Sequence, residues 1–306
     1  MNKNLVALLT VLLLCALACC AAAQGTNVTV KDMYGREIAL SEPAQRIVAL
    51  TASDCEILCA LGCGDRLVGR GAYCDYPESI LSVPVVQSGM ETNIEEILAL
   101  QPQVVLMSDM AQSKEMVDML EANGVKVAVS NADDIHGVYE AIGIIGALMG
   151  EQDRAKALIG QMRSAFDAIA SAGEGGGKTV YFEVSPLQYG LWTAGGGTFM
   201  NELAEICGLE NAFSDVEGWA QISQEQVLAR DPDYIVTIAM YFGEGPTPVE
   251  EIMGRSGWEA LKAVKNGCVY NADSNAVSRP GPRLMDAAIE LNEFIRSAQE
   301  QAAPAA

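Results

Sequence analysis

The sequence predicts an α/β protein with two lobes of similar build joined by one long helix. Three observations predict this class. Short apolar strands without alternation are interleaved with helices, which is typical of parallel sheets covered on both faces. The pattern at 134–172 is purely that of helices. One unit also occurs twice, as NIEEILALQPQVVLM at 93–107 and SQEQVLARDPDYIVT at 223–237.

The N-terminal stretch MNKNLVALLTVLLLCALACCAAAQ has the form of an export signal. Its apolar run at 5–18 is shorter than the ~20 residues that a membrane-spanning helix needs. ALAC resembles a bacterial lipobox in which Cys19 would be lipidated, and Cys20 is a second candidate. Cleavage after Ala23 is the alternative and would give a soluble product. We favour a lipoprotein with residues 1–23 as its signal, because cysteine is otherwise unusual at the end of a signal.

The elements of a first lobe follow at 27–150. NVTVKDMYGREIAL alternates around a Tyr-Gly turn and predicts a hairpin. RIVALT, RLVGRG and VPVVQ predict strands, with a cysteine-containing helix after the first of them. The first repeated unit then adds a short helix and a strand, and MVDMLEANGVKVAVS adds another such pair.

Both repeated units carry the same helix signals. Each begins with an N-cap residue followed three positions later by Glu or Gln, a capping box; the pairs are Asn93 with Glu96 and Ser223 with Gln226. A proline ends each helix before the strand begins.

The middle of the chain connects the two halves. A helix at 134–150 is followed by a long amphipathic helix at 151–173, and a second α/β lobe begins with TVYFEVS and occupies 178–300. We therefore predict two Rossmann-like lobes with mainly parallel sheets, joined by a single long interdomain helix at 151–173. The ligand cleft is expected between the lobes, because binding sites favour domain interfaces.

Three cysteines in SDCEILCALGCGD raise the question of a metal site. Cys55, Cys59 and Cys63 are spaced i, i+4, i+8, which would place the thiols on one helix face. Successive turns are ~5.4 Å apart, which suits a buried stripe better than one tetrahedral centre. We favour core packing and predict no metal site, with a metal or redox role as the alternative.

Charge and histidine content exclude several function classes. The formal net charge is −21, whereas nucleic-acid binding needs a basic surface. The chain has one histidine, which leaves no zinc triad of histidines and argues against histidine-based catalysis. We expect no enzyme and no resident cofactor.

Several strings, in this order and at these spacings, resemble the two-lobed substrate-binding proteins of ABC importers for cobalamin, haem and iron-siderophores. They are YCDYPESI, NIEEILALQP, AEICGLENAF and WAQISQEQVLARDP, and they are most similar to the cobalamin-binding members. The resemblance implies a monomeric extracytoplasmic protein that captures a metal chelate. It also implies an ABC permease dimer with its ATPase as partner, and a lipid anchor in the membrane.

The resemblance also implies which loops line the cleft. Tyr73, Trp192, Trp219 and Tyr241 lie in predicted loops and would offer flat apolar area to a macrocycle or catechol. Each could instead pack at the rim of its own lobe. Arg279 could grip an anionic group of the ligand, or the RPGPR segment could simply fix a loop. For Arg283, in the same segment, an interlobe salt bridge is equally plausible.

Two glutamates occupy matched positions in the repeated units. Glu95 and Glu225 each stand in the first turn of a helix, where the helix dipole favours acids. In the resembled family, glutamates at these positions pair with arginines of the permease. We therefore predict that Glu95 and Glu225 dock the protein onto its permease.

The chain departs from the cobalamin-binding pattern, because two further tryptophans expected near VVQSGM and after VVLM are absent. An iron-siderophore, haem or a related corrinoid would suit the same frame. For haem, Tyr73 or Tyr76 would be the axial candidate. Two alternatives from other classes are a metal- or cluster-handling enzyme on the same frame and a surface sensor without an importer.

Overall fold

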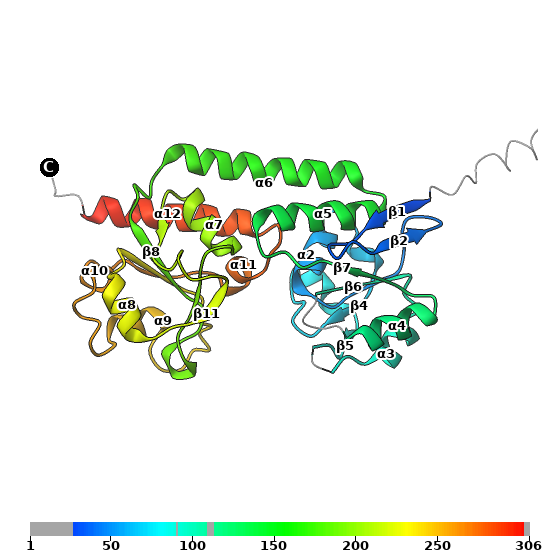
Figure 1. The fold of residues 1–306 in the computed structure, drawn as a ribbon, viewed down its shortest axis with the longest axis horizontal. Coiled ribbons are helices and arrows are strands. Elements are labelled where there is room, and N and C mark those ends of the chain that lie inside the picture. The colour runs from blue at the N-terminus through cyan, green and yellow to red at the C-terminus, as the bar shows by residue number, and fades with distance from the viewer. Residues whose placement is uncertain (1–26, 90, 109–112, 303–306) are drawn as a thin grey trace, which may run out of the picture.

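A computed structural model describes residues 27–89, 91–108 and 113–302. It confirms the predicted fold class: two α/β lobes lie side by side, and helix α6 (Gln152–Ala172) runs across both of them (Figure 1). None of the helices in this part of the chain could cross a bilayer.

The N-terminal lobe is built on a five-stranded, wholly parallel sheet in the order β5-β4-β3-β6-β7. Its strands are β3 (Ile47–Ala49), β4 (Leu67–Gly71), β5 (Val85–Val86), β6 (Val104–Met107) and β7 (Lys126–Val129). The predicted hairpin precedes them as the antiparallel pair β1 (Val28–Lys31) and β2 (Glu37–Leu40).

The C-terminal lobe repeats this plan with a parallel sheet in the order β10-β8-β12-β13. Its strands are β8 (Thr179–Glu183), β10 (Glu210–Asn211), β12 (Tyr234–Thr237) and β13 (Val269–Asn271). The order matches β4-β3-β6-β7 of the first lobe, so the repeated strands β6 and β12 hold equivalent places. A separate antiparallel pair, β9 (Trp192–Ala194) and β11 (Trp219–Gln221), is added to this lobe.

Helices cover both sheets. Those of the first lobe are α2 (Ala52–Ala60), α3 (Ile94–Ala99), α4 (Lys114–Ala122) and α5 (Ile135–Met149). Those after α6 are α7 (Phe199–Ile206), α8 (Gln224–Arg230), α9 (Pro248–Met253), α10 (Lys262–Lys265), α11 (Ser274–Ser278) and α12 (Leu284–Ala302). Short 3₁₀ turns occupy Gly64–Arg66, Glu78–Ser82 and Leu187–Tyr189.

The two repeated units fold alike down to single backbone angles. Each residue before the proline has a positive φ, 50° at Gln101 and 44° at Asp231. Ser223 forms the predicted capping box with Gln226. The first unit has only half of it: Asn93 accepts from the amide of Glu96, but the Glu96 carboxylate turns away to accept from the amide of Gln87 (3.0 Å).

Helix α6 is amphipathic and buries Ala155, Met162, Phe166 and Ile169. It packs against α5 of one lobe and against α7 and α12 of the other. As a result one cluster of buried apolar side chains extends through both lobes, from Ile38 to Ile295. The two lobes therefore share one hydrophobic core.

The cysteine stripe differs from its prediction. Helix α2 ends at Ala60, and Gly62 has a φ of +73°, so Cys63 lies beyond the helix. The thiol of Cys55 instead shares the carbonyl oxygen of Ala49 with that of Cys74, at 3.8 Å each. All six cysteines of the described residues are unpaired, and these residues hold no cluster of three potential metal-ligating side chains.

Candidate functional site

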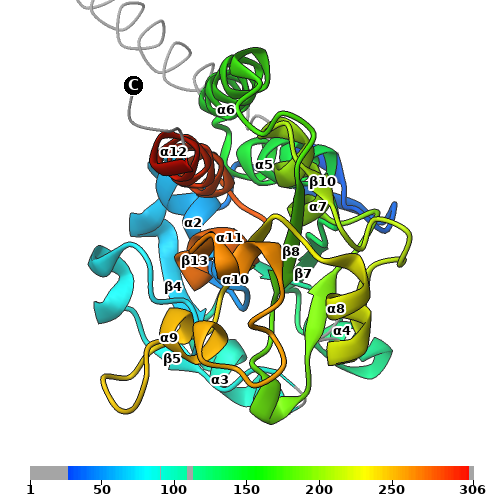
Figure 2. The same ribbon diagram turned by 90° about the vertical axis from the view of Figure 1, so that its left-hand side faces the viewer.

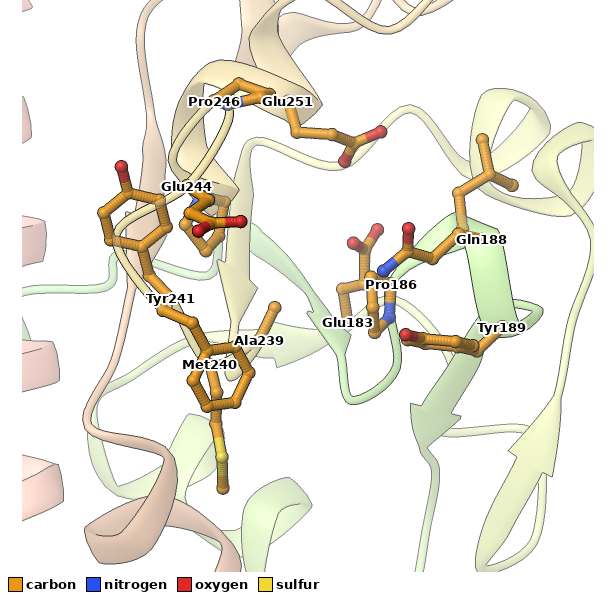
Figure 3. Close-up of a pocket in the computed structure, with 13 residues that line it drawn as sticks. Glu183, Pro186, Gln188, Tyr189, Ala239, Met240, Tyr241, Glu244, Pro246 and Glu251 are labelled. Atoms are coloured by element: carbon orange, nitrogen blue, oxygen red, sulfur yellow. The ribbon is translucent and has the colours of Figure 1, made fainter.

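A cavity of about 520 Å³ lies in the C-terminal lobe, at the carboxyl ends of β8 and β12 (Figure 3). This is the edge of a parallel sheet at which α/β proteins bind their ligands. Two loops form it, one after each strand. The lining residues are Glu183, Pro186, Leu187, Gln188, Tyr189, Ala239, Met240, Tyr241, Phe242, Glu244, Pro246, Pro248 and Glu251.

Exposed rings form the walls of this cavity. Tyr189 is 75% exposed at the end of the 3₁₀ turn that follows Pro186. Phe242 is 85% exposed, and the neighbouring Tyr241 donates its hydroxyl to the carbonyl of Gly245 (3.3 Å). Large apolar side chains left uncovered around a concavity are typical of ligand-binding surfaces.

Carboxylates form the floor. Glu183, at the end of β8, is buried and receives two hydrogen bonds from the guanidinium of Arg255, at 2.8 and 3.0 Å. Arg255 also pairs with Glu251, and it lies 4.1 Å from the ring centre of Trp258. Burial raises the pKa of Glu183, while the pairing with Arg255 opposes that rise. Figure 3 shows Glu183 and Glu251 turned toward the space between Tyr241 and Tyr189.

Two tryptophans share one face of the β9–β11 ribbon. Trp192 pairs with Gln221 and Trp219 with Ala194, so the two indoles are diagonal neighbours. They are 40% and 41% exposed, and Trp219 also contacts the ring of Phe199, with 5.4 Å between centroids. The remaining tryptophan, Trp258, is fully buried.

Glycines bring this ribbon together. The amides of Gly195 and Gly196 bond the carbonyls of Gly218 and Val216 at 2.8 Å. A Cβ on Gly195 would lie 2.0 Å from the oxygen of Val216, so the TAGGGTF segment needs glycine for this close backbone approach.

Tyr73 of the first lobe follows β4 and is 84% exposed. Of the four predicted ligand-contacting aromatic residues only Tyr241 lines the cavity, and Tyr73, Trp192 and Trp219 lie outside its lining. The loop of Tyr73 is held from the other lobe. Arg279, after α11, donates to the carbonyl of Tyr73 (3.1 Å), to Asp75 (2.7 Å) and to Glu56 (3.0 Å). These contacts favour the second of the two roles considered for Arg279, fixing a loop, because its guanidinium already donates to protein partners.

Arg283 completes this interlobe contact. It donates to both oxygens of Glu56, at 2.9 and 2.7 Å, and stacks over the ring of Tyr76 at 4.2 Å. Glu56 is buried in α2, so one carboxylate of the first lobe is shared by two arginines of the second. The interlobe salt bridge anticipated for Arg283 is confirmed. The pKa of Asp75 is lowered by its hydrogen bond from Arg279. We call Glu56, Asp75, Arg279 and Arg283 the interlobe clamp.

Comparison with known proteins places this geometry in a family. The family described as Periplasmic binding protein matches residues 47–276. The chain belongs to this family. The binding protein is also 34% identical over 275 residues to YvrC of Bacillus subtilis, an uncharacterized ABC transporter substrate-binding lipoprotein; the match covers 88% of this chain and 85% of YvrC.

Two further comparisons agree. A vitamin B12-binding protein of Yersinia pestis is 31% identical over 204 residues, 64% of this chain and 70% of the relative. The crystal structure of a possible iron-binding (periplasmic solute-binding) protein of Staphylococcus epidermidis has a TM-score of 0.71 at 30% identity, covering 83% of this chain and 99% of that one. This protein is thus an extracytoplasmic substrate-binding protein of the ABC transporter class and not an enzyme.

In this binding protein the two predicted docking glutamates are exposed. Glu95 lies in the first turn of α3 and Glu225 in that of α8, and both helices lie away from α6 (Figures 1 and 2). A hydrogen bond from Ser223 lowers the pKa of Glu225. Within the described residues neither carboxylate forms a salt bridge. Cys19 and the signal at 1–23 lie outside the described residues.

Sequence reasoning missed part of the site. Tyr189, Met240 and Phe242 line the cavity and were not among the predicted residues. A signal was present for two of them, because Met240 and Phe242 flank Tyr241 in the string AMYFGEG. Tyr189 follows β8 in the segment SPLQYG, whose proline and glycine mark a turn.

Proposed function

We propose that this protein captures a bulky metal chelate, a corrinoid or a ferric siderophore, and delivers it to an ABC permease dimer with its ATPase. Tyr73, Trp192, Trp219 and Tyr241 contact the ligand, and Tyr189 and Phe242 extend the same surface. Arg279 serves the ligand indirectly by holding the Tyr73 loop.

The set of exposed aromatic rings after the parallel strands carries this proposal. Tyr73, Tyr189, Tyr241 and Phe242 belong to loops or turns, Trp192 and Trp219 belong to the β9–β11 ribbon, and all leave flat apolar faces exposed. Such faces match the large, partly apolar surface of a chelate better than they match a free ion. The names of the similar proteins, which speak of vitamin B12 and of iron, point to the same class.

Delivery rests on the two exposed glutamates. Equivalent acids on two similar lobes suit a two-fold permease that carries two equivalent basic sites. Exposed charge pairs of this kind mainly set orientation and association rate. Lipidation of Cys19 would keep the protein at the membrane and close to its permease.

Tryptophan fluorescence tests the ligand assignment. Trp192 and Trp219 are half-exposed, whereas Trp258 is buried and serves as an internal reference. Titration of the mature domain with cyanocobalamin, ferric siderophores and haemin is expected to quench the first two. Trp192→Phe with Trp219→Phe should remove the response. No response to any chelate would contradict the proposal.

Haem is a second candidate because Tyr73 is exposed, so that its hydroxyl is accessible for an axial bond to the haem iron. Within the described residues, the single histidine, His136, lies in α5 and contacts Glu140 (3.7 Å), away from the cavity lining. A tyrosinate-to-iron absorption band that appears with haemin and is lost in Tyr73→Phe would support haem over the other chelates.

A further inference from the structure

The arginines around the candidate site are all neutralised by the protein itself. Arg279 and Arg283 are balanced by the carboxylates of Glu56 and Asp75, and Arg283 also lies 3.6 Å from Asp273. Arg255 is balanced by Glu183 and Glu251. A guanidinium held in this way, whose charge is balanced by at least one buried carboxylate, attracts an anionic ligand only weakly.

The cavity itself has an excess of acid. Its described lining includes Glu183, Glu244 and Glu251 but no lysine, arginine or histidine. One guanidinium, that of Arg255, compensates part of this charge from below. Glu244 is exposed on the loop after β12 and forms no salt bridge within the described residues. Figure 3 shows its carboxylate on the same side of the cavity as Tyr241.

From these two features we infer that the protein selects its cargo by charge: the ligand is a chelate with no net negative charge. The inference rests on the proposed function and narrows it. A corrinoid with a periphery of uncharged amides fits, and so does a hydroxamate siderophore with a free ammonium group. Ligands with several carboxylates or catecholates, and haem with two propionates, are rejected.

The physical reason is repulsion combined with missing partners. An anionic group brought between the aromatic walls loses water and faces three carboxylates that share one guanidinium, in a region where the effective dielectric is below that of water. Amide and ammonium groups would instead donate to Glu244 and Glu251 in charge-assisted hydrogen bonds. Selection against a competitor by built-in repulsion is a common route to specificity. The net charge of −21 adds a field that slows the approach of anions.

Matched ligand pairs test the inference, because each pair differs mainly in charge. The first pair is cyanocobalamin and its monocarboxylate, in which one propionamide is hydrolysed. The second is ferrioxamine B, which is cationic, and its N-succinyl derivative, which is anionic. We expect the anionic member of whichever pair binds to have a Kd higher by at least about tenfold at low salt. This gap between the two Kd values should narrow as salt is added.

Variants assign the effect to the cavity. Glu244→Gln alone, and Glu244→Gln with Glu251→Gln, should reduce the gap between the pair by several-fold. Glu259→Gln removes the same charge from an exposed position of the same lobe and should leave the gap unchanged. Circular dichroism verifies that each variant is folded. If the double variant does not fold, the single Glu244 variant decides the test, because within the described residues it disturbs no ion pair.

The outcomes separate the two proposals. Equal affinity within a pair, tighter binding of the anionic member, or haemin as the tightest ligand would overturn charge selection while leaving chelate capture intact. A gap that persists in the Glu244 variants would remove the cavity from the explanation and overturn the inference as well. No binding of any chelate would end the proposed function and this inference with it.

Discussion

At the scale of single residues, the partner of a charged side chain decides its role. Arg279 and Arg283 stand in one short segment, yet their common acceptor Glu56 lies 223 and 227 residues earlier in the chain. The sequence suggested a ligand contact or a loop-fixing role for Arg279 and an interlobe salt bridge for Arg283, but it contained no local sign of the acceptor. The structure therefore moves Arg279 from gripping the ligand to holding the loop of Tyr73.

Asp54 in α2 gives the first prediction. Its carboxylate is buried and accepts hydrogen bonds from Ser130 and Thr51. Burial raises its pKa from 3.8 to about 6, and the two hydroxyls only partly oppose this. The native state therefore binds a proton more readily than the unfolded state, and the contribution of Asp54 to stability falls as the pH rises from about 4 to about 6.

Asp54→Asn removes this titration while keeping the shape of the side chain. Relative to the wild type, its free energy of unfolding should rise by about 2 kcal/mol between pH 4 and pH 7. Urea denaturation at a series of pH values measures the difference. A constant difference between the two proteins across this range would show that Asp54 keeps an ordinary pKa when folded.

At the scale of elements, local signals were sufficient wherever local chemistry sets the structure. The cap at Ser223, the proline stops and the apolar strands predicted α8 and β12, and the same signals predicted α3 and β6. Prediction failed where a tertiary contact competes. Glu96 leaves its cap to bond Gln87. The end of the cysteine helix was missed for a local reason, because Gly62 adopts a positive φ and Cys63 lies beyond the helix. The cavity walls were also not predicted from the sequence, because Tyr189 becomes part of a site only when the loop that follows β12, about 50 residues later, faces it.

Gln101 gives the prediction that belongs to an element. It connects α3 to β6 with a φ of 50°, a conformation that disfavours side chains with a Cβ by about 1 kcal/mol. Gln101→Gly should therefore stabilise the protein, by about 0.5 kcal/mol after the added flexibility of the unfolded chain is allowed for. Gln101→Val should destabilise it. Thermal unfolding followed by circular dichroism compares them.

The equivalent Asp231 supplies the control. It has the same kind of backbone conformation, but its carboxylate also accepts from the amide of Lys262 (2.8 Å). Asp231→Gly should therefore show a smaller gain or none. A loss of stability in Gln101→Gly would indicate that the backbone at this position is not strained.

At the scale of the whole molecule, the lobes are connected at more than the long helix. The interlobe clamp ties α2 to the segment after α11. On another side, the amide of Phe199 donates to the carbonyl of Asp133 (2.8 Å), and Glu202 accepts from the amide of Ile135 (2.5 Å). Together with the shared apolar core, these contacts predict a nearly rigid frame with little closure on ligand binding.

Glu56→Gln tests the clamp. It leaves two arginines facing one neutral acceptor, and breaking a buried ion pair from one side typically destabilises by about 3 kcal/mol. We expect a loss of this size in urea denaturation, faster hydrogen exchange in the Tyr73 loop, and weaker ligand binding. The comparison is Asp215→Asn, which breaks the more exposed pair with Arg230. It should leave exchange at Tyr73 unchanged. Unchanged exchange in the Glu56 variant would show that the loop is held by other means.

The proposed docking onto the permease is also a property of the whole molecule, because in this proposal one acid from each lobe is presented at a fixed separation. A rigid frame keeps Glu95 and Glu225 apart at a constant distance and thereby makes two simultaneous contacts possible. Glu95→Ala with Glu225→Ala should leave ligand affinity unchanged, since both residues lie outside the cavity lining. The double variant should bind the permease about tenfold more weakly and support little uptake.

Proteoliposomes with the reconstituted permease and ATPase measure uptake, and fluorescence titration measures ligand binding. The matched control, Glu121→Ala with Glu259→Ala, removes one exposed acid from each lobe at other positions and should transport normally. Each single docking variant should lie between the wild type and the double variant, because one contact still orients the protein. Full transport by the double variant would exclude the docking role, and weakened ligand binding would instead assign the two glutamates to the ligand site.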